Sequence, residues 1–220
     1  LALALIGLAL GGLMGLMQAL DRVGIVIYKS MLLQSYYQGL TIHGVLLAFL
    51  FTFGFGNAFV SLMAIRGFER PLASTFLVQG AFWTMLVGTV LAAYAILRNQ
   101  ATVLFTFYAP MRASSLFYLG AALLVVSTLL TTLNLVLTRR AWQREHPGER
   151  TPLLGFVSVV TYVMWALASL GVVVLVIFLL LPWQLGWIDT TDPQFNRILF
   201  WYTGHAIVYF WLMPAYISWY

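Results

Sequence analysis

The chain has 220 residues, of which 62% are hydrophobic and only 8% are charged. Soluble domains carry charge on roughly a quarter of their residues, so this composition excludes a soluble globular fold and predicts an integral membrane protein. The net charge of +5 comes from 11 basic and 6 acidic residues in short connectors, without the basic stripe expected of a protein that binds nucleic acid. With no cysteine and only three histidines, histidine is the main candidate for a metal ligand.

Six stretches are long and apolar enough to cross a bilayer, which takes about 20 residues. In chain order they are residues 1–20, 35–65, 72–97, 114–138, 153–181 and 198–220. We therefore expect an all-α fold, a polytopic bundle of transmembrane helices that forms a single transmembrane domain over residues 1–220. The sequence starts without methionine and stops inside an apolar run, so we expect a fragment of a longer polypeptide.

Two features within the spans predict local geometry. Gly7, Gly11 and Gly15 recur every four residues in the first span, a pattern that lets another helix approach closely and that usually serves packing. Pro214 is the one proline inside a span, and we expect it to kink the last helix.

The basic residues of the connectors predict how the bundle is oriented in the membrane. The run Arg139–Arg150 is expected to be a loop, and its arginines place it on the cytoplasmic side by the positive-inside rule. The amino end of the chain then lies on the same side. His146, beside a proline and a glycine in this run, is expected to be a solvated loop residue.

The other two histidines lie within spans, where ionisable residues are rare and usually functional. A neutral imidazole can bind haem iron or copper. The alternative is that each histidine donates a single hydrogen bond to a neighbouring helix. For His43 the flanking Gly39 and Gly44 favour a role as a haem ligand, because these small residues would let a flat macrocycle approach the backbone.

The last span carries a possible proton path. His205 and Tyr209 are four residues apart, so they share a face of a helix. Tyr216 and Tyr220 point within roughly 20° of Tyr209 at about 100° per residue. A row of hydroxyls along the helix could carry protons toward a metal site, although tyrosine also occurs in ordinary helix packing and in interfacial belts.

Three stretches carry a family resemblance: Tyr36–Leu46 (YYQGLTIHGVL), Ala101–Pro110 (ATVLFTFYAP) and Phe200–Trp211 (FWYTGHAIVYFW). They resemble subunit I of the haem-copper oxidases, most closely the B-type branch of the terminal oxidases. The resemblance runs in order over essentially the whole chain and corresponds to the N-terminal half of that subunit, the first six of twelve or more helices.

The resemblance implies the following roles for the metal-binding residues. His43 would be one of two axial ligands of a low-spin haem, and His205 one of three ligands of copper B. Tyr209 would be the phenol that becomes bonded to His205 and supplies an electron and a proton when the O–O bond breaks. The remaining ligands of the copper and of the low-spin and high-spin haems would lie beyond Tyr220.

Four further residues receive roles from the same resemblance. Tyr216 and Tyr220 match tyrosines of a proton pathway that rises from the cytoplasmic side. Trp201 would line the oxygen-reducing pocket, and Tyr108 would lie near a haem edge.

The sequence departs from the family pattern at two positions. The customary proline after the copper-binding histidine is Ala206, which removes a backbone restraint. A customary asparagine near the low-spin haem is Leu47, which removes a polar group there. Neither change removes a metal ligand.

The implied function is that of a terminal respiratory oxidase that reduces O₂ to water with electrons from cytochrome c or a similar donor, coupled to proton translocation. Its expected partners are the other oxidase subunits, including the subunit II that carries the electron-entry site, in the lipid bilayer of a prokaryotic plasma membrane. The fragment alone is expected to be inactive.

Three alternatives stay open. A nitric oxide reductase of the same superfamily is disfavoured, because those enzymes lack the His-x-x-x-Tyr pair and place a glutamate in this region. A quinol oxidase remains possible, since other subunits mainly determine the electron donor. Outside the superfamily, the chain would be a non-enzymatic membrane transporter or scaffold with incidental histidines.

Overall fold

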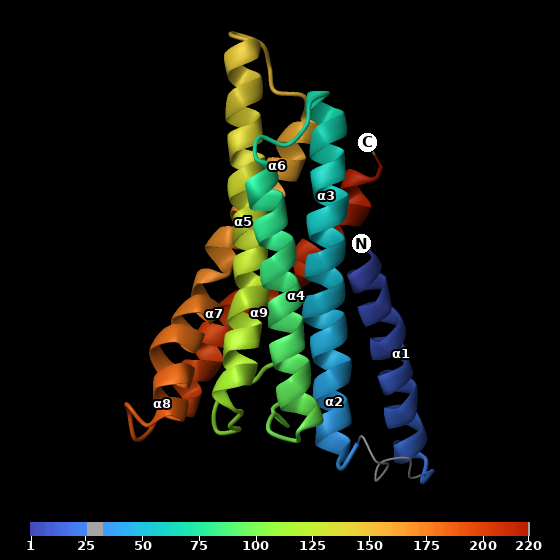
Figure 1. Cartoon of the computed structure of the whole chain (residues 1–220), viewed down its shortest axis with the longest axis vertical. Coiled ribbons are helices and arrows are strands. Elements are labelled where there is room, and N and C mark those ends of the chain that lie inside the picture. The colour runs from blue at the N-terminus through green and yellow to red at the C-terminus, as the bar shows by residue number, and fades with distance from the viewer. Residues whose placement is uncertain (26–32, 220) are drawn as a thin grey trace.

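The computed structural model describes residues 1–25 and 33–219, and this part of the chain contains helices and no strand. Figure 1 shows long helices lying side by side in an elongated bundle. Six helical stretches are long and apolar enough to cross a membrane, as predicted. They are α1 (Ala2–Arg22); α2, η1 and α3 (Tyr36–Val45, Leu46–Phe51 and Thr52–Phe68); α4 (Thr75–Leu97); α5 (Ser115–Glu145); α6, α7, η2 and α8 (Leu153–Ala168, Leu170–Val174, Leu175–Leu180 and Leu181–Leu185); and α9 (Pro193–Ile217).

Polar side chains fix where three of these stretches begin. Ser35 accepts a hydrogen bond from the backbone N–H of Gln38, and Ser74 accepts one from Leu77. Asp192 accepts from the first turn of α9, which has Pro193 at its first position. These are the residues preferred at helix N-termini, because they satisfy backbone donors that have no partner within the helix. The last helix therefore begins at Pro193 rather than at residue 198.

The expected loop from Arg139 to Arg150 is in large part helical. Helix α5 continues to Glu145 and is the long helix that extends past its neighbours at the top of Figure 1. Arginine, glutamine and glutamate are good helix formers, so charge alone does not end a helix where the membrane ends. Arg70 and Glu145 form a salt bridge of 2.8 Å that ties this extension to the end of α3.

His146 follows directly after α5, outside any helix, as expected. Its ring is not fully solvated, however, because it stacks on the indole of Trp142 with the ring centroids 4.5 Å apart and the planes 8° from parallel. Its Nδ1 lies 3.1 Å from the carbonyl oxygen of Trp142. His146 is therefore a partly covered residue at a helix end, far along the chain from the other two histidines.

Two stretches change from α-helical to π-helical winding in mid-span. The segment η1 begins three residues after His43, and η2 lies between α7 and α8. π turns in an α-helix recur at functional sites. At the end of η1 the hydroxyl of Thr52 donates a hydrogen bond of 2.5 Å to the carbonyl oxygen of Ala48.

The glycine stripe of the first span is a helix contact, as predicted. A Cβ atom built on Gly7 would lie 3.0 Å from Leu50, and one on Gly11 would lie 2.7 Å from Leu47. Helix α1 therefore lies close against α2 and η1, beside which it stands in Figure 1. Helix α9 continues through Pro214, whose ring is buried, and ends three residues later.

Buried polar groups join the central helices. The hydroxyl of Tyr162 donates to Asn57 Oδ1 at 2.8 Å, and Asn57 Nδ2 donates to the hydroxyl of Ser127 at 2.9 Å. Ser127 donates in turn to the carbonyl oxygen of Ala81 at 2.7 Å. This chain of bonds connects α6, α3, α5 and α4.

Candidate functional site

His43 lies on α2 with its ring against α1. Its Nδ1 is 2.8 Å from the carbonyl oxygen of Gly11. The ring fits there because the third glycine of the stripe has no side chain: a Cβ on Gly15 would lie 2.7 Å from His43 Cε1. A carbonyl oxygen can only accept, so Nδ1 carries a proton, and in the neutral imidazole Nε2 then has the free electron pair that a metal could bind.

An apolar cleft of about 550 Å³ opens beside this imidazole. It is bordered by α1, the α2–η1 stretch, the connector after α4, and α9. The lining residues are Leu8, Leu40, His43, Gly44, Leu47, Ala48, Phe51, Thr52, Leu104, Phe105 and Trp211. A volume of this size is typical of cofactor sites, which are mostly apolar with a few polar groups.

The two glycines that flank His43 in sequence differ in their surroundings. Gly44 lines the cleft, as expected, and its missing side chain also makes room for Phe105, whose Cβ would lie 2.8 Å from a Cβ on Gly44. Gly39 is buried and does not line the cleft. Leu47, at one of the two departures from the family pattern, lines the cleft and packs on Gly11.

His205 and Tyr209 lie next to each other on one face of α9, as the spacing predicted. Their ring centroids are 5.1 Å apart, with the planes at 66°. This face is uncovered within the described residues: Trp201 is 42% exposed, Tyr209 58% and Tyr216 45%. Tyr220 lies outside the described residues.

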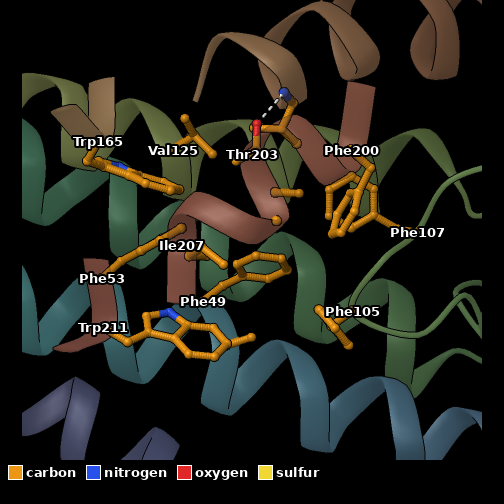
Figure 2. A pocket seen from close by; sticks show the side chains of 14 residues that line it. Phe49, Phe53, Phe105, Phe107, Val125, Trp165, Phe200, Thr203, Ile207 and Trp211 are labelled. Carbon is orange, nitrogen blue, oxygen red and sulfur yellow. Dashed lines mark hydrogen bonds between the residues drawn. The ribbon is translucent and has the colours of Figure 1, made fainter. Parts of the chain in front are cut away.

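The opposite face of α9 borders a small internal cavity of about 20 Å³ (Figure 2). Phe49, Phe53, Phe107, Trp165 and Phe200 surround it, so it is apolar. The Thr203 hydroxyl lines the cavity, but it already accepts a hydrogen bond from the Val172 N–H at 2.9 Å and donates one to the Ala168 carbonyl at 2.7 Å.

The cavity adjoins the cleft beside His43. Both are lined by Ala48, Phe105 and Trp211. Phe105 and Trp211 therefore form an aromatic layer between the cleft and the cavity.

Tyr108 lies in the connector between α4 and α5, with its ring centroid 5.5 Å from that of Phe200. It is partly buried and is not among the residues that line the cleft beside His43. The same connector is tied to α2, because the Leu104 N–H donates to the Thr41 hydroxyl at 2.9 Å.

Within residues 1–25 and 33–219, no three His, Cys, Asp or Glu side chains lie close enough together to hold a metal ion. A metal ion at His43 or at His205 would therefore need further ligands from outside this part of the chain. Sequence reasoning missed the carbonyl of Gly11 and the space at Gly15 as part of the site. The glycine spacing was the available signal, but it does not reveal which side chain it will face.

Comparison with known proteins agrees with this arrangement. Residues 1–220 match the family model described as cytochrome c and quinol oxidase polypeptide I. Cytochrome c oxidase subunit 1 of Thermus thermophilus is 43% identical over 98% of this chain, and heme-copper oxidase subunit I+III of Aeropyrum pernix is 29% identical over 91% of it.

A solved heme-copper terminal oxidase dimer contains a similar chain, with a TM-score of 0.92 and 38% identity over 98% of this chain. The present chain spans 39% of the Thermus relative, 27% of the Aeropyrum relative and 37% of the solved chain. Fold, residues and relatives agree, and the chain belongs to the cytochrome c and quinol oxidase polypeptide I family, as a multi-pass membrane protein.

Proposed function

We propose that this chain is part of the catalytic subunit of a terminal respiratory oxidase, which reduces O₂ to water and couples the reaction to proton translocation. The observation that carries the proposal is the apolar cleft of about 550 Å³ that His43 borders in a chain of this family. The hydrogen bond between Nδ1 and the Gly11 carbonyl would also be made by a histidine that only joins two helices, so it is the cleft that favours a haem ligand.

The family implies haem and copper, and the donor chemistry of the residues fits a haem at His43. A histidine that ligates a metal usually donates its other ring N–H to a carbonyl or carboxylate, which is the hydrogen bond His43 makes with Gly11. Nε2 is then the ligating atom. Leu40, Leu47 and Phe105 would cover a macrocycle with apolar surface and keep water away from it.

His205 fits one position of a copper site, since neutral imidazole is a common copper ligand. The other ligands would come from parts of the longer polypeptide outside this chain. An imidazole on an exposed helix face within a membrane span supports this proposal, because such groups rarely face lipid.

Bound haem and copper would supply the one-electron and oxygen chemistry. The overall reaction consumes one O₂, four electrons and four protons and yields two waters. The Tyr209 hydroxyl would be the group that can give up one proton and one electron for cleavage of the O–O bond. An electron from the donor and a proton passed along Tyr216 and Tyr220 would restore the phenol.

The partners follow from the same proposal. Electrons would arrive from cytochrome c or a similar donor through another oxidase subunit, and the complex would reside in a prokaryotic plasma membrane. Trp201, four residues before His205 on the exposed face, would line the oxygen-reducing pocket. Tyr108 would lie near a haem edge.

The test compares three histidine variants of the full-length polypeptide in its assembled complex. We expect His43→Ala to lose the low-spin haem and His205→Ala to lose the copper, because each removes a ligating nitrogen. His146→Ala is the matched control and should retain both, since His146 stacks on Trp142 at a helix end.

The readouts are the haem absorption spectrum and metal analysis of the purified complex. Full haem and copper content in both His43→Ala and His205→Ala would refute the proposal and favour a scaffold or transporter.

A further inference from the structure

The three glycines of the stripe on α1, Gly7, Gly11 and Gly15, face three different side chains, one helical turn apart. Cβ atoms on Gly7 and Gly11 would meet the aliphatic side chains of Leu50 and Leu47. A Cβ on Gly15 would instead meet the imidazole of His43, at 2.7 Å from Cε1 and 2.9 Å from Nδ1. The third glycine therefore differs from the other two in what it makes room for.

The same helix supplies the hydrogen bond that orients this ring. The Gly11 carbonyl oxygen lies 2.8 Å from His43 Nδ1, one turn before Gly15. The two residues act on one imidazole from adjacent turns: one accepts its N–H, and the other leaves the space that lets the N–H reach the acceptor.

We infer that α1 is the positioning element of the haem ligand, with Gly11 setting the tautomer of His43 and Gly15 setting the place of its ring. This inference rests on the proposed function of His43. It assigns to the glycine stripe a role beyond helix packing. In physical terms, a carbonyl that accepts the Nδ1–H makes Nε2 more electron-rich and fixes the plane of the ring.

A haem bound at Nε2 responds to both effects. Hydrogen bonds to the axial ligand are among the means by which a protein adjusts the reduction potential of haem iron. The orientation of the imidazole plane sets the anisotropy of the electron paramagnetic resonance (EPR) spectrum of a low-spin ferric haem. Displacing the ring at Gly15 should therefore change properties of the iron, and not only the stability of the bundle.

The key variant is Gly15→Ala in the full-length oxidase complex. We expect the added methyl group to push the imidazole from its seat and to shift both the EPR g-values and the midpoint potential of the low-spin haem. Loss of an outer partner of a metal ligand typically costs about 10-fold or more in metal affinity, so we also expect lower haem occupancy.

Two glycines of the same helix serve as matched controls. Gly12→Ala adds the same methyl group where no atom lies within 4 Å, so it reports the effect of the substitution on the helix itself. Gly7→Ala adds it against Leu50, at 3.0 Å, so it disturbs the contact of α1 with η1 without touching His43. Both should keep the wild-type g-values and midpoint potential.

The outcomes separate this inference from the proposed function. If His43→Ala loses the low-spin haem while Gly15→Ala keeps the wild-type spectrum and potential, the inference is wrong and the ligand assignment stands. If His43→Ala keeps the low-spin haem, the ligand assignment itself fails. If Gly7→Ala shifts the g-values and the midpoint potential as much as Gly15→Ala does, the glycine stripe serves only the packing of α1, and the inference is wrong.

A measurement on the unchanged protein covers the case in which Gly15→Ala does not assemble. With ¹⁵N-labelled histidine, electron–nuclear double resonance of the low-spin ferric haem reports which ring nitrogen binds iron and whether the other carries a proton. We expect a protonated, hydrogen-bonded Nδ1 on the ligand from α2. A deprotonated Nδ1, or iron bound through Nδ1, would overturn the inference.

Discussion

At the scale of single residues, the sequence identifies candidates but not their surroundings. His43 and His205 stand out because ionisable side chains are rare in apolar membrane spans. The spacing of four residues on a helix places Tyr209 beside His205. The bond between His43 and the Gly11 carbonyl joins residues 32 positions apart on different helices. No local pattern encodes it, because the contact depends on how α1 packs against α2.

Tyr209→Phe tests the role of the phenol. It removes the hydroxyl but keeps the ring that lies 5.1 Å from His205, so we expect the metal centres to assemble normally. Oxygen consumption should fall by about 10²-fold or more, as is typical when a positioned proton donor is lost. The measurement is O₂ uptake by the purified full-length complex, with metal content determined in parallel.

Tyr94→Phe provides the control for this prediction. Tyr94 lies on α4 and is 53% exposed, and nothing in its position associates it with His205. Its loss of a hydroxyl should leave O₂ uptake unchanged. Wild-type uptake in Tyr209→Phe would contradict the assigned role.

At the scale of helices, hydropathy predicts how many spans there are, and the polar residues between them predict where some begin. All six spans are present, yet α9 begins earlier than expected. The signal for that start was in the sequence, since aspartate followed by proline is a common helix beginning. The two π segments have no such signal, because their residues are as apolar and helix-compatible as the turns around them.

Gly88→Ala tests the close contact between α4 and α5. A Cβ on Gly88 would lie 2.8 Å from the backbone oxygen of Gly120, and backbone cannot move aside as a flexible side chain can. We expect the helices to separate, at a cost of about 1–3 kcal/mol, the usual range for overpacking. The midpoint of thermal unfolding in detergent should fall.

The control for this prediction is Gly12→Ala, which adds a methyl group in open space. It should leave the unfolding midpoint of the complex nearly unchanged. An equal midpoint in the Gly88 and Gly12 variants would mean that the α4–α5 contact yields easily and is not a tight backbone approach.

At the scale of the whole molecule, composition alone separates membrane from soluble proteins, and three short motifs indicate the family. What neither reveals is how the two histidine sites relate in space. Phe105 and Trp211 line both the cleft beside His43 and the internal cavity, and so form an aromatic layer between these two spaces, whereas His205 lies on the opposite face of α9 from the cavity. That layer is assembled from the connector after α4 and from α9, which are distant in sequence.

The described residues leave one face of α9 uncovered. Trp201, His205, Tyr209 and Tyr216 lie on it, and the chain spans 39% of its Thermus relative. We expect the rest of the longer polypeptide to cover this face and to complete both metal centres. The 220-residue chain by itself should show no oxidase activity, because on the proposed assignment it would supply only one ligand to the low-spin haem and one to the copper.

The most direct test of the central claim is a density map of the purified full-length complex around His43. We predict a planar macrocycle in the cleft lined by Leu47, Phe105 and Trp211, with its iron bound by Nε2 of His43 and with Nδ1 on the Gly11 carbonyl. A cleft filled by lipid or by protein side chains, with no iron at Nε2, would contradict the account.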